Sequence, residues 1–241
     1  MKDYLQDIVQ HTHGLGFIDL VKITGTAEET RLDAMDLENR TVVVMAKFKN
    51  PVPEFVGTFG MPNLGKLNII LNIPEYKENA SITVTQKEGG ELDGINFVNK
   101  TGDFRNDYRF MSAGIVNAKL QTVQFRGANW TVSFVPTVAS IQKLKFQSQA
   151  NAEETTFLVK TDKGNLKFFF GSASTHEGSF VFEQGVAEMK RNFAYPVAQV
   201  IAILNLPGDK TMNISDENGA LKITVDSGIA DYDYIIPANT K

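Results

Sequence analysis

The stretch GMPNLGKL at residues 60–67 comes close to a phosphate-binding loop, in which Gly, four residues, Gly and Lys precede a Ser or Thr. Leu67 stands where the hydroxyl group that would hold magnesium is required. Pro62 removes a backbone N–H that would help to cradle phosphate. We therefore interpret this stretch as the start of a helix and expect no ATP site in the chain.

The three histidines do not form a metal site. His11 and His13 are two residues apart, so on a helix their side chains point about 200° away from each other and cannot share an ion. His176 stands alone in STHEGS, a composition typical of a turn. A metal centre or a histidine-based catalytic site is therefore not expected.

Other catalytic residue types are also scarce. Cysteine is absent, which excludes disulfides, thiol catalysis and zinc–thiolate sites. The acidic clusters at 27–30, 152–155 and 231–234 fit solvated loops better than a pair of catalytic carboxylates, and nothing resembles a nucleophile elbow. The sequence predicts a protein that is not an enzyme and that needs no cofactor.

A different chemistry is suggested by a long segment without acids. The chain carries 28 Asp and Glu against 24 Lys and Arg, yet residues 108–152 contain no acid at all. The basic residues of that segment are Arg109, Lys119, Arg126, Lys143 and Lys145. An acidic protein with one acid-free lining is able to bind a polyanion there, whatever its net charge of −4.

Most of the remaining sequence predicts strands. Short runs rich in β-branched and aromatic residues alternate with Gly, Asn and Asp. These runs are FIDLVKIT, TVVVMAKFK, SITVTQK, INFVNK, TFLVKT, LKFFFG, SFVFEQ, LKITVDS and YDYIIPA. Turn signals such as KEGGE, TDKGN and DENGA separate several of them.

Four stretches have the spacing of amphipathic helices instead. They are residues 3–12, 62–72, 137–149 and 196–206. Pro62 and Pro196 are expected at the first helical position, where a missing N–H costs nothing. Many strands with few helices predict an α+β fold.

The helices indicate an internal duplication. The second ends in ILNIP at 70–74 and the fourth in ILNLP at 203–207, an offset of 133 residues, and a strand hairpin follows each. We therefore expect two similar β-rich domains with two helices each. The predicted bounds are residues 1–110 and 131–241, joined by a connector at 111–130 that shows no clean period.

The third helix lies inside the acid-free segment. Its spacing predicts that Val138, Ile141 and Leu144 face the core while Ser140 and Lys143 face outward. A solvated helix face is one interpretation. A face beside a polyanion is the other, because solvated faces usually mix Glu with Lys. The residues alone leave both open.

Several stretches in order resemble a known family. They are VGTFGMPNLGKLNIILN, SIQKLKFQSQAN, TTFLVKTDKGNLKFFF and GALKITVDSGIADYDYIIPA. Two β-rich domains with two helices each resemble a DNA sliding clamp, and the closer resemblance is to the DNA polymerase processivity clamp of T-even-type bacteriophages. Family pore helices usually carry more Lys and Arg than the third and fourth helices have here.

The resemblance implies a homotrimer that closes into a ring of six similar domains, with helices around the hole. It implies sequence-independent contact with duplex DNA, tethering of a DNA polymerase, and opening by an ATP-driven clamp loader. The implied pore residues are Lys2, Lys66, Lys143 and Lys145.

The family also binds short hydrophobic peptides of its partners between the connector and the last strand. The matching positions are Tyr234, Ile236 and Pro237, with Ile115 or Val116 from the connector. Strand alternation predicts that one of Ile235 and Ile236 is core and the other lines the pocket.

Two other functions remain open at this stage: a structural virion or tail β-protein, and a single-stranded DNA-binding protein with two OB-like barrels. The second requires aromatic and basic residues interleaved on strands, for which LKFFFG is a weak candidate.

The N-terminus MKDYLQDIVQ shows no signal-peptide pattern and no run is long enough to cross a membrane. The expected setting is the cytoplasm of a bacterial host, without membrane attachment.

Overall fold

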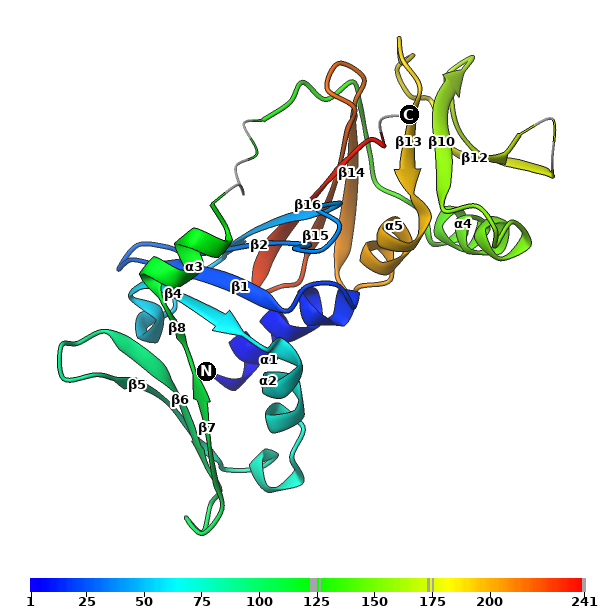
Figure 1. Ribbon diagram of the computed structural model, residues 1–241. Coiled ribbons are helices and arrows are strands. Elements are labelled where there is room, and N and C mark those ends of the chain that lie inside the picture. Colours follow the sequence, from blue (N-terminus) through cyan, green and yellow to red (C-terminus); the bar gives the residue numbers. More distant parts are fainter. Residues whose placement is uncertain (122–124, 126, 173, 175, 240–241) are drawn as a thin grey trace. The chain divides into compact units, whose positions relative to one another are not determined.

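A computed structural model describes residues 1–121, 125, 127–172, 174 and 176–239 of the chain (Figure 1). The chain divides into two compact units. Unit 1 comprises Met1–Arg40, Val44–Val123 and Ser227–Tyr232, and unit 2 comprises Thr41–Val43, Gln124–Asp226 and Asp233–Lys241. The predicted domain bounds at 1–110, 111–130 and 131–241 stay a prediction.

Unit 1 begins with a helix and combines two sheets. Its helices are α1 (Lys2–His11), α2 (Leu64–Leu71) and α3 (Ala113–Lys119), with short 3-10 turns η1 (His13–Leu15), η2 (Pro53–Phe55) and η3 (Pro74–Tyr76). Its strands are β1 (Leu20–Gly25), β2 (Thr30–Met35), β3 (Val43–Phe48), β4 (Gly57–Pro62), β5 (Ser81–Gln86), β6 (Leu92–Val98), β7 (Arg105–Arg109) and β8 (Met111–Ser112). One sheet has the strand order β8-β4-β1-β2-β3 within this unit and the other has the order β5-β6-β7.

Unit 2 repeats this plan. Its helices are α4 (Val138–Ala150) and α5 (Val197–Leu204). Its strands are β9 (Val132–Phe134), β10 (Thr156–Asp162), β11 (Asn165–Gly171), β12 (Glu177–Gln184), β13 (Phe193–Pro196), β14 (Asp209–Ser215), β15 (Ala220–Asp226) and β16 (Ala230–Pro237). The first residues of β16, up to Tyr232, belong to unit 1. One sheet has the order β12-β11-β10-β13, and β16-β15-β14-β9 are neighbours in the other.

The matched order of elements agrees with the duplication that the sequence predicts. A helix, four strands, a second helix and a hairpin follow one another in both units. The second helices begin at Leu64 and Val197, which gives the offset of 133 residues found in the sequence. The hairpins begin at Ser81 and Asp209, an offset of 128, because the loop before β5 is longer than the loop before β14.

The four predicted helices are all present, but neither Pro62 nor Pro196 occupies the first helical position that the sequence predicted. Pro62 ends β4 rather than opening α2, because it is paired with Leu20 of β1 and stays extended. Asn63 then takes a left-handed conformation (φ 52°) as the N-cap, which Asn tolerates better than most residues. Pro196 likewise ends β13 and is the N-cap of α5.

Helix α3 lies within the predicted connector and was not expected. Its sequence AGIVNAK has no amphipathic period, and Val116 is its one buried residue, so the helix has no broad apolar face. Val116 is fully buried against β4, where a Cβ at Gly60 would lie only 2.8 Å from Cγ2 of Val116. Glycine at position 60 therefore makes room for this helix. Residues 122–124 and 126 of the connector lie outside the described residues.

The predicted core face of α4 is partly wrong. Leu144 is fully buried as expected, but the side chain of Val138 is 76% exposed. Ser140, expected outside, is buried because its Oγ donates to the carbonyl of Phe182 at 2.7 Å. The N-cap Thr137 accepts from the backbone N of Ser140 at 3.0 Å and so fixes this rotation of the first turn.

Aromatic side chains fill much of the core of unit 2. Phe168 stacks on Phe182 with ring centroids 4.4 Å apart and also meets Phe157 at 4.6 Å. The LKFFFG run, weighed above as a base-stacking surface, thus places Phe168 and Phe170 in the core, where they cannot stack on nucleotides.

No helix in the described part of the chain is long and apolar enough to span a membrane.

Candidate nucleic-acid interface

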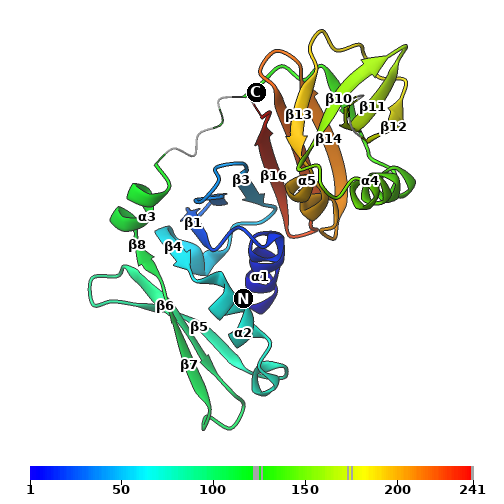
Figure 2. The ribbon, with the colours of Figure 1, turned by 45° about the vertical axis from the view of Figure 1, so that its right-hand side comes forward.

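The helices of each unit lie in pairs. Helix α1 packs beside α2 in unit 1, and α4 packs beside α5 in unit 2 (Figure 2). In each pair the apolar stripe is turned to the sheet, as the buried positions Leu5, Leu67, Leu144 and Val200 indicate. The opposite faces of the helices in each unit form the candidate interface.

These outer faces are almost free of acids. Helices α2, α4 and α5 contain neither Asp nor Glu. Helix α1 has Asp3, which is exposed, and Asp7, which is not. The candidate interface therefore offers a single exposed carboxylate on these helices.

Asp7 takes part in a buried polar cluster instead. Its Oδ2 accepts a hydrogen bond from the hydroxyl of Tyr232 at 2.8 Å, and its Oδ1 lies 3.3 Å from Nδ1 of His11. The rings of His11 and Tyr232 are stacked with centroids 4.6 Å apart. A buried carboxylate with these partners is stabilised without exposing its charge. Helical spacing alone does not reveal this burial, because the partner Tyr232 lies on the last strand.

The predicted pore lysines differ in their freedom to reach an anion. Lys66 and Lys143 are exposed, and Lys145 is half-buried. Lys2 donates from Nζ to the backbone carbonyls of Tyr76 at 2.8 Å and of Lys77 at 3.3 Å. Its ammonium is therefore already engaged in unit 1. Among the four, Lys66 and Lys143 are best placed for phosphate contact; they lie in different units.

Neutral groups make up most of the rest of the interface. A groove of about 390 Å³ between α1 and α2 is lined by amides of both helices and by His13. The amide side chains are Gln6, Gln10, Asn68 and Asn72. Amides can donate to phosphate oxygens without carrying charge. Two apolar side chains also reach the surface here, Ile69 of α2 (68% exposed) and Phe146 of α4 (63% exposed).

The predicted peptide-pocket residues are distributed unevenly between surface and core. Ile115 is 53% exposed and Pro237 is exposed, whereas Val116, Tyr234 and Ile236 are fully buried. The expected difference between the two isoleucines is not found, because Ile235 is also buried at 5%. Both faces of β16 are covered, so strand alternation alone does not select a pocket residue. The assignment of the pocket stays a prediction.

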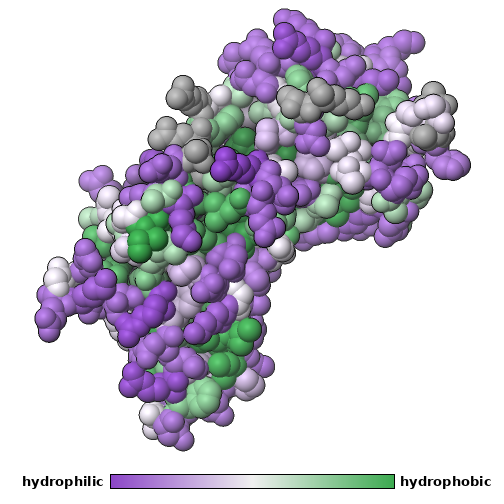
Figure 3. Space-filling model, in the orientation of Figure 1, coloured by the Kyte–Doolittle hydropathy of each residue, from purple (hydrophilic) through white to green (hydrophobic). Residues whose placement is uncertain are grey.

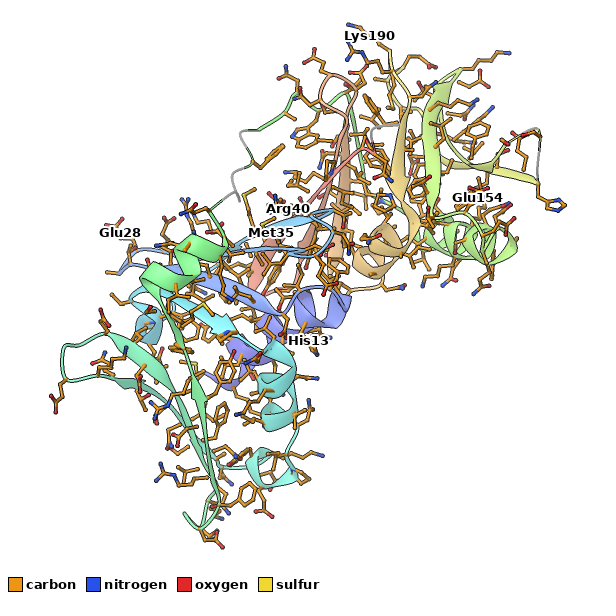
Figure 4. All side chains as sticks on the ribbon, viewed as in Figure 1. His13, Glu28, Met35, Arg40, Glu154 and Lys190 are labelled. Atoms are coloured by element: carbon orange, nitrogen blue, oxygen red, sulfur yellow. The ribbon has the colours of Figure 1, made fainter. Side chains whose placement is uncertain are left out.

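A hollow that the sequence did not indicate lies at one end of the unit 1 sheet. It has a volume of about 500 Å³ and is lined by residues that include Met35, Leu37, Met111 and Lys119. Figure 4 labels two of its lining residues, His13 in η1 just after α1 and Met35 at the end of β2. Met111 and Lys119 belong to the predicted connector, but none of the five predicted pocket residues lines this hollow.

Both units together have the DNA-clamp fold, an α+β fold rich in strands. Similar solved structures are a complex of the C-terminal region of FEN-1 with A. fulgidus PCNA and the PCNA of Thermococcus kodakaraensis. The first has a TM-score of 0.69 at 10% identity over 100% of this chain and 97% of that chain. The second has a TM-score of 0.68 at 13% identity over 98% of this chain and 97% of that chain.

A PCNA2–PCNA3 complex from Sulfolobus tokodaii is similar as well, with a TM-score of 0.67 at 13% identity over 98% of this chain and 97% of that chain. No protein-family model and no curated protein sequence matches this chain. At such low identity the likeness establishes the fold, which is that of the sliding clamp PCNA.

Proposed function

We propose that this chain is a DNA sliding clamp. The observation that carries the proposal is that helices α2, α4 and α5 of a clamp fold contain no acid, in a chain with 28 Asp and Glu against 24 Lys and Arg. A hole lined by lysine and amide side chains tolerates a phosphate backbone at close range and reads no sequence. The protein then acts without catalysis, as a tether for a DNA polymerase.

The clamp acts as a homotrimer in this proposal, with two similar domains per chain, bounded at 1–110 and 131–241 around a connector at 111–130. Two strands offer edges for head-to-tail pairing: β7 at the edge of its sheet in unit 1 and β12 at the edge of its sheet in unit 2. The exposed side chains of β7 are Arg105, Asp107 and Arg109, which leaves one positive charge in excess. Strand β12 carries the exposed Glu177 and the half-buried Glu183 and no base, so the net charges of the two edges are opposite. Pairing between copies would also cover edges that otherwise favour aggregation.

The proposed partner proteins are those that the resemblance to DNA sliding clamps implies. A DNA polymerase and an ATP-driven clamp loader would bind the ring, and the phosphate-binding-loop pattern at 60–67 is incomplete, so ATP would be hydrolysed by the loader. The partner-peptide pocket at Ile115, Val116, Tyr234, Ile236 and Pro237 is retained as part of the proposal, as is the origin in a T-even-type phage replicating in bacterial cytoplasm. Because three of the five are buried, peptide contact would start from Ile115 and Pro237.

The proposal is tested by threading, which needs no partner protein. A closed ring enters linear duplex DNA over its ends, whereas a protein that grips the surface of DNA does not need ends. We expect association with linear duplex whose ends are free, and no association when both ends carry streptavidin before the protein is added. Equal association with both substrates would contradict the proposal. Light scattering provides the companion measurement, and the expected mass is three times the 26.7 kDa of the chain. A large polydisperse assembly would favour the structural virion protein instead.

A further inference from the structure

An apolar groove opens on unit 2 beside the start of α4. It has a volume of about 470 Å³, and its lining includes Val135, Pro136, Val138 and Ile141 on one side and the first residues of β14 on the other. Val135 is 66% exposed and Val138 is 76% exposed. Exposure of two neighbouring valines costs stability and is retained more readily where it binds something. Surface apolar residues elsewhere in the visible face form small patches among polar ones (Figure 3).

The internal repeat provides a matched position in unit 1. There the start of α1 takes the place of the start of α4, and the start of β5 takes the place of the start of β14. The loop from α2 to β5 covers residues 72–80, nine residues, whereas the loop from α5 to β14 covers 205–208, four residues. The longer loop contains η3 and brings Tyr76 into the matched position.

Tyr76 fills that position from within the chain. It is 1% exposed, and its ring meets Phe97 and Phe104 with centroids 5.7 Å and 5.6 Å away. Its hydroxyl donates to Oδ1 of Asn106 at 2.9 Å. Its carbonyl accepts from Nζ of Lys2, the residue that corresponds to Val138. The remaining hollow beside Tyr76 has only about 230 Å³.

The groove in unit 2 also exposes a strand edge. Strand β9 pairs with Met212, Asn213 and Ile214 of β14. The strand β14 begins earlier, at Asp209, so within the described residues Asp209–Thr211 pairs with β15 alone. An extended peptide can add to such an edge through its backbone while its side chains enter an adjacent groove.

We propose that the unit 2 groove binds a short segment of a partner protein. A turn of this segment inserts an aromatic side chain where unit 1 inserts Tyr76 from η3, and the residues beside the turn extend along the β14 edge. Asp209 and Asp226 line the groove together with one lysine, Lys210, whose Nζ donates to the carbonyl of Gly208 at 2.8 Å. Two acids against one base leave the rim acidic, so the segment carries a basic residue next to the aromatic one, as Lys77 follows Tyr76 in unit 1. This site lies wholly within unit 2 and does not depend on ring formation. It is therefore separate from the proposed pore and from the pocket predicted at the last strand.

The chain itself supplies the probe. A synthetic peptide IPEYKENA, residues 73–80, is titrated into the full-length protein while methyl signals of Val135, Val138 and Ile141 are followed by NMR. We expect saturable shifts of these methyl groups with a dissociation constant in the millimolar range, as suits a single anchor. The peptide with Ala in place of Tyr is expected to produce at least a tenfold weaker response.

Val138→Lys, which installs the residue type that unit 1 has at the matched position, should abolish the shifts of Val135 and Ile141. Leu158→Lys on β10, where the side chain is 37% exposed, is the matched control and should leave them unchanged. Absence of shifts with the tyrosine peptide, or equal shifts with the alanine peptide, would overturn the proposal. A lower oligomer mass of Val138→Lys would also overturn it, because another copy of the chain would then cover the groove.

Discussion

Units 1 and 2 follow the same order of helices and strands, yet the same position is filled in one and open in the other. In unit 1 the nine-residue loop buries Tyr76, and in unit 2 the four-residue loop leaves Val138 exposed. A loop insertion is thermodynamically inexpensive when the added residues bury apolar surface of their own. If the proposed binding holds, the duplicated unit uses this position for stability in unit 1 and for binding in unit 2.

The two units also differ in the charge of their sheet edges. The β7 edge of unit 1 carries arginines, which pair locally with acids: Arg105 lies 3.3 Å from Asp107, and Arg109 contacts Asp93. The β12 edge of unit 2 carries glutamates. Opposite charges on two edges favour pairing of unlike edges over pairing of like ones, because like charges directly opposite each other are destabilising. The head-to-tail contact that we propose between copies would use this asymmetry.

Reversing the edge charges should have the largest effect. Arg105→Glu with Arg109→Glu, or Glu177→Lys with Glu183→Lys, is expected to break the trimer into smaller species. All four changes in one chain should restore assembly, because the edges are again complementary with exchanged signs. Light scattering measures the mass. Reversal of Lys87 and Lys100, which are exposed on unit 1, serves as the control. If the fourfold variant stays dissociated, the two edges do not pair with each other.

Tyr76→Ala tests whether the filled position stabilises unit 1. Loss of a buried aromatic side chain and its hydrogen bond should lower the free energy of unfolding by about 3–5 kcal/mol. Val138→Ala at the matched position of unit 2 should change it by about 0.5 kcal/mol or less, because that side chain is exposed. Urea unfolding monitored by circular dichroism provides both values. Similar losses for the two variants would remove the distinction between the filled and the open groove.

Neutralising one lysine in each unit tests the proposed pore, and we expect a moderate change in the salt dependence of DNA association. Lys66→Gln with Lys143→Gln should lower the salt dependence of DNA association by about one unit of slope for each of the two lysines that touches phosphate. The mass of the trimer should be unchanged. Association with linear duplex at several salt concentrations gives the slope. A slope equal to that of Lys87→Gln with Lys100→Gln would show that these helices do not touch phosphate.

The smallest effect concerns Asp216 of unit 2. Hydrogen bonds from Oγ1 of Thr131 and then from the backbone N of Lys190 hold the pKa of Asp216 below its usual value of 3.8. A lowered pKa stabilises the fold fully above the unfolded value, and this contribution is lost as pH falls through the folded pKa. Asp216→Asn should therefore be less stable than the parent at neutral pH, and the difference should shrink below pH 3.8. Urea unfolding across that range measures it, with Glu217→Gln as control. A pH-independent difference would contradict the assignment.

Much of the fold could be predicted because its signals are local. Helical spacing located α1, α2, α4 and α5, and alternation located most of the longer strands. The repeat was visible because ILNIP and ILNLP end the second helix of each unit. The predicted runs missed helix α3 and the strands β2, β4, β7, β8, β9 and β13. A strand of two to four residues has no period, β2 (TRLDAM) and β7 (RNDYR) are rich in polar residues, and β4 (GTFGMP) contains two glycines. Helix α3 is held by the contact of Val116 with Gly60.

Residue types in the sequence predicted the candidate site, and tertiary contacts then showed which of its side chains are exposed and which are engaged or buried. Composition identified the acid-free helices and, on them, Lys66 and Lys143 as exposed cations. It could not show that Lys2 is engaged by the carbonyl of Tyr76, 74 positions away in sequence. Nor could spacing show that Ile235 and Ile236 are both buried, because burial of a strand on two faces depends on what packs against it.

The sequence by itself determined the α+β class, the repeated order of elements and the separation of acids from the helices, because these properties depend on periodicity and composition. The tertiary structure alone decided which of these side chains remain available. Asp7 is removed from the surface by Tyr232, 225 positions away in sequence, and the groove at Val138 stays open because a loop far along the chain is short. Contacts between residues distant in sequence leave no periodic trace, so they are visible only after folding brings the partners together.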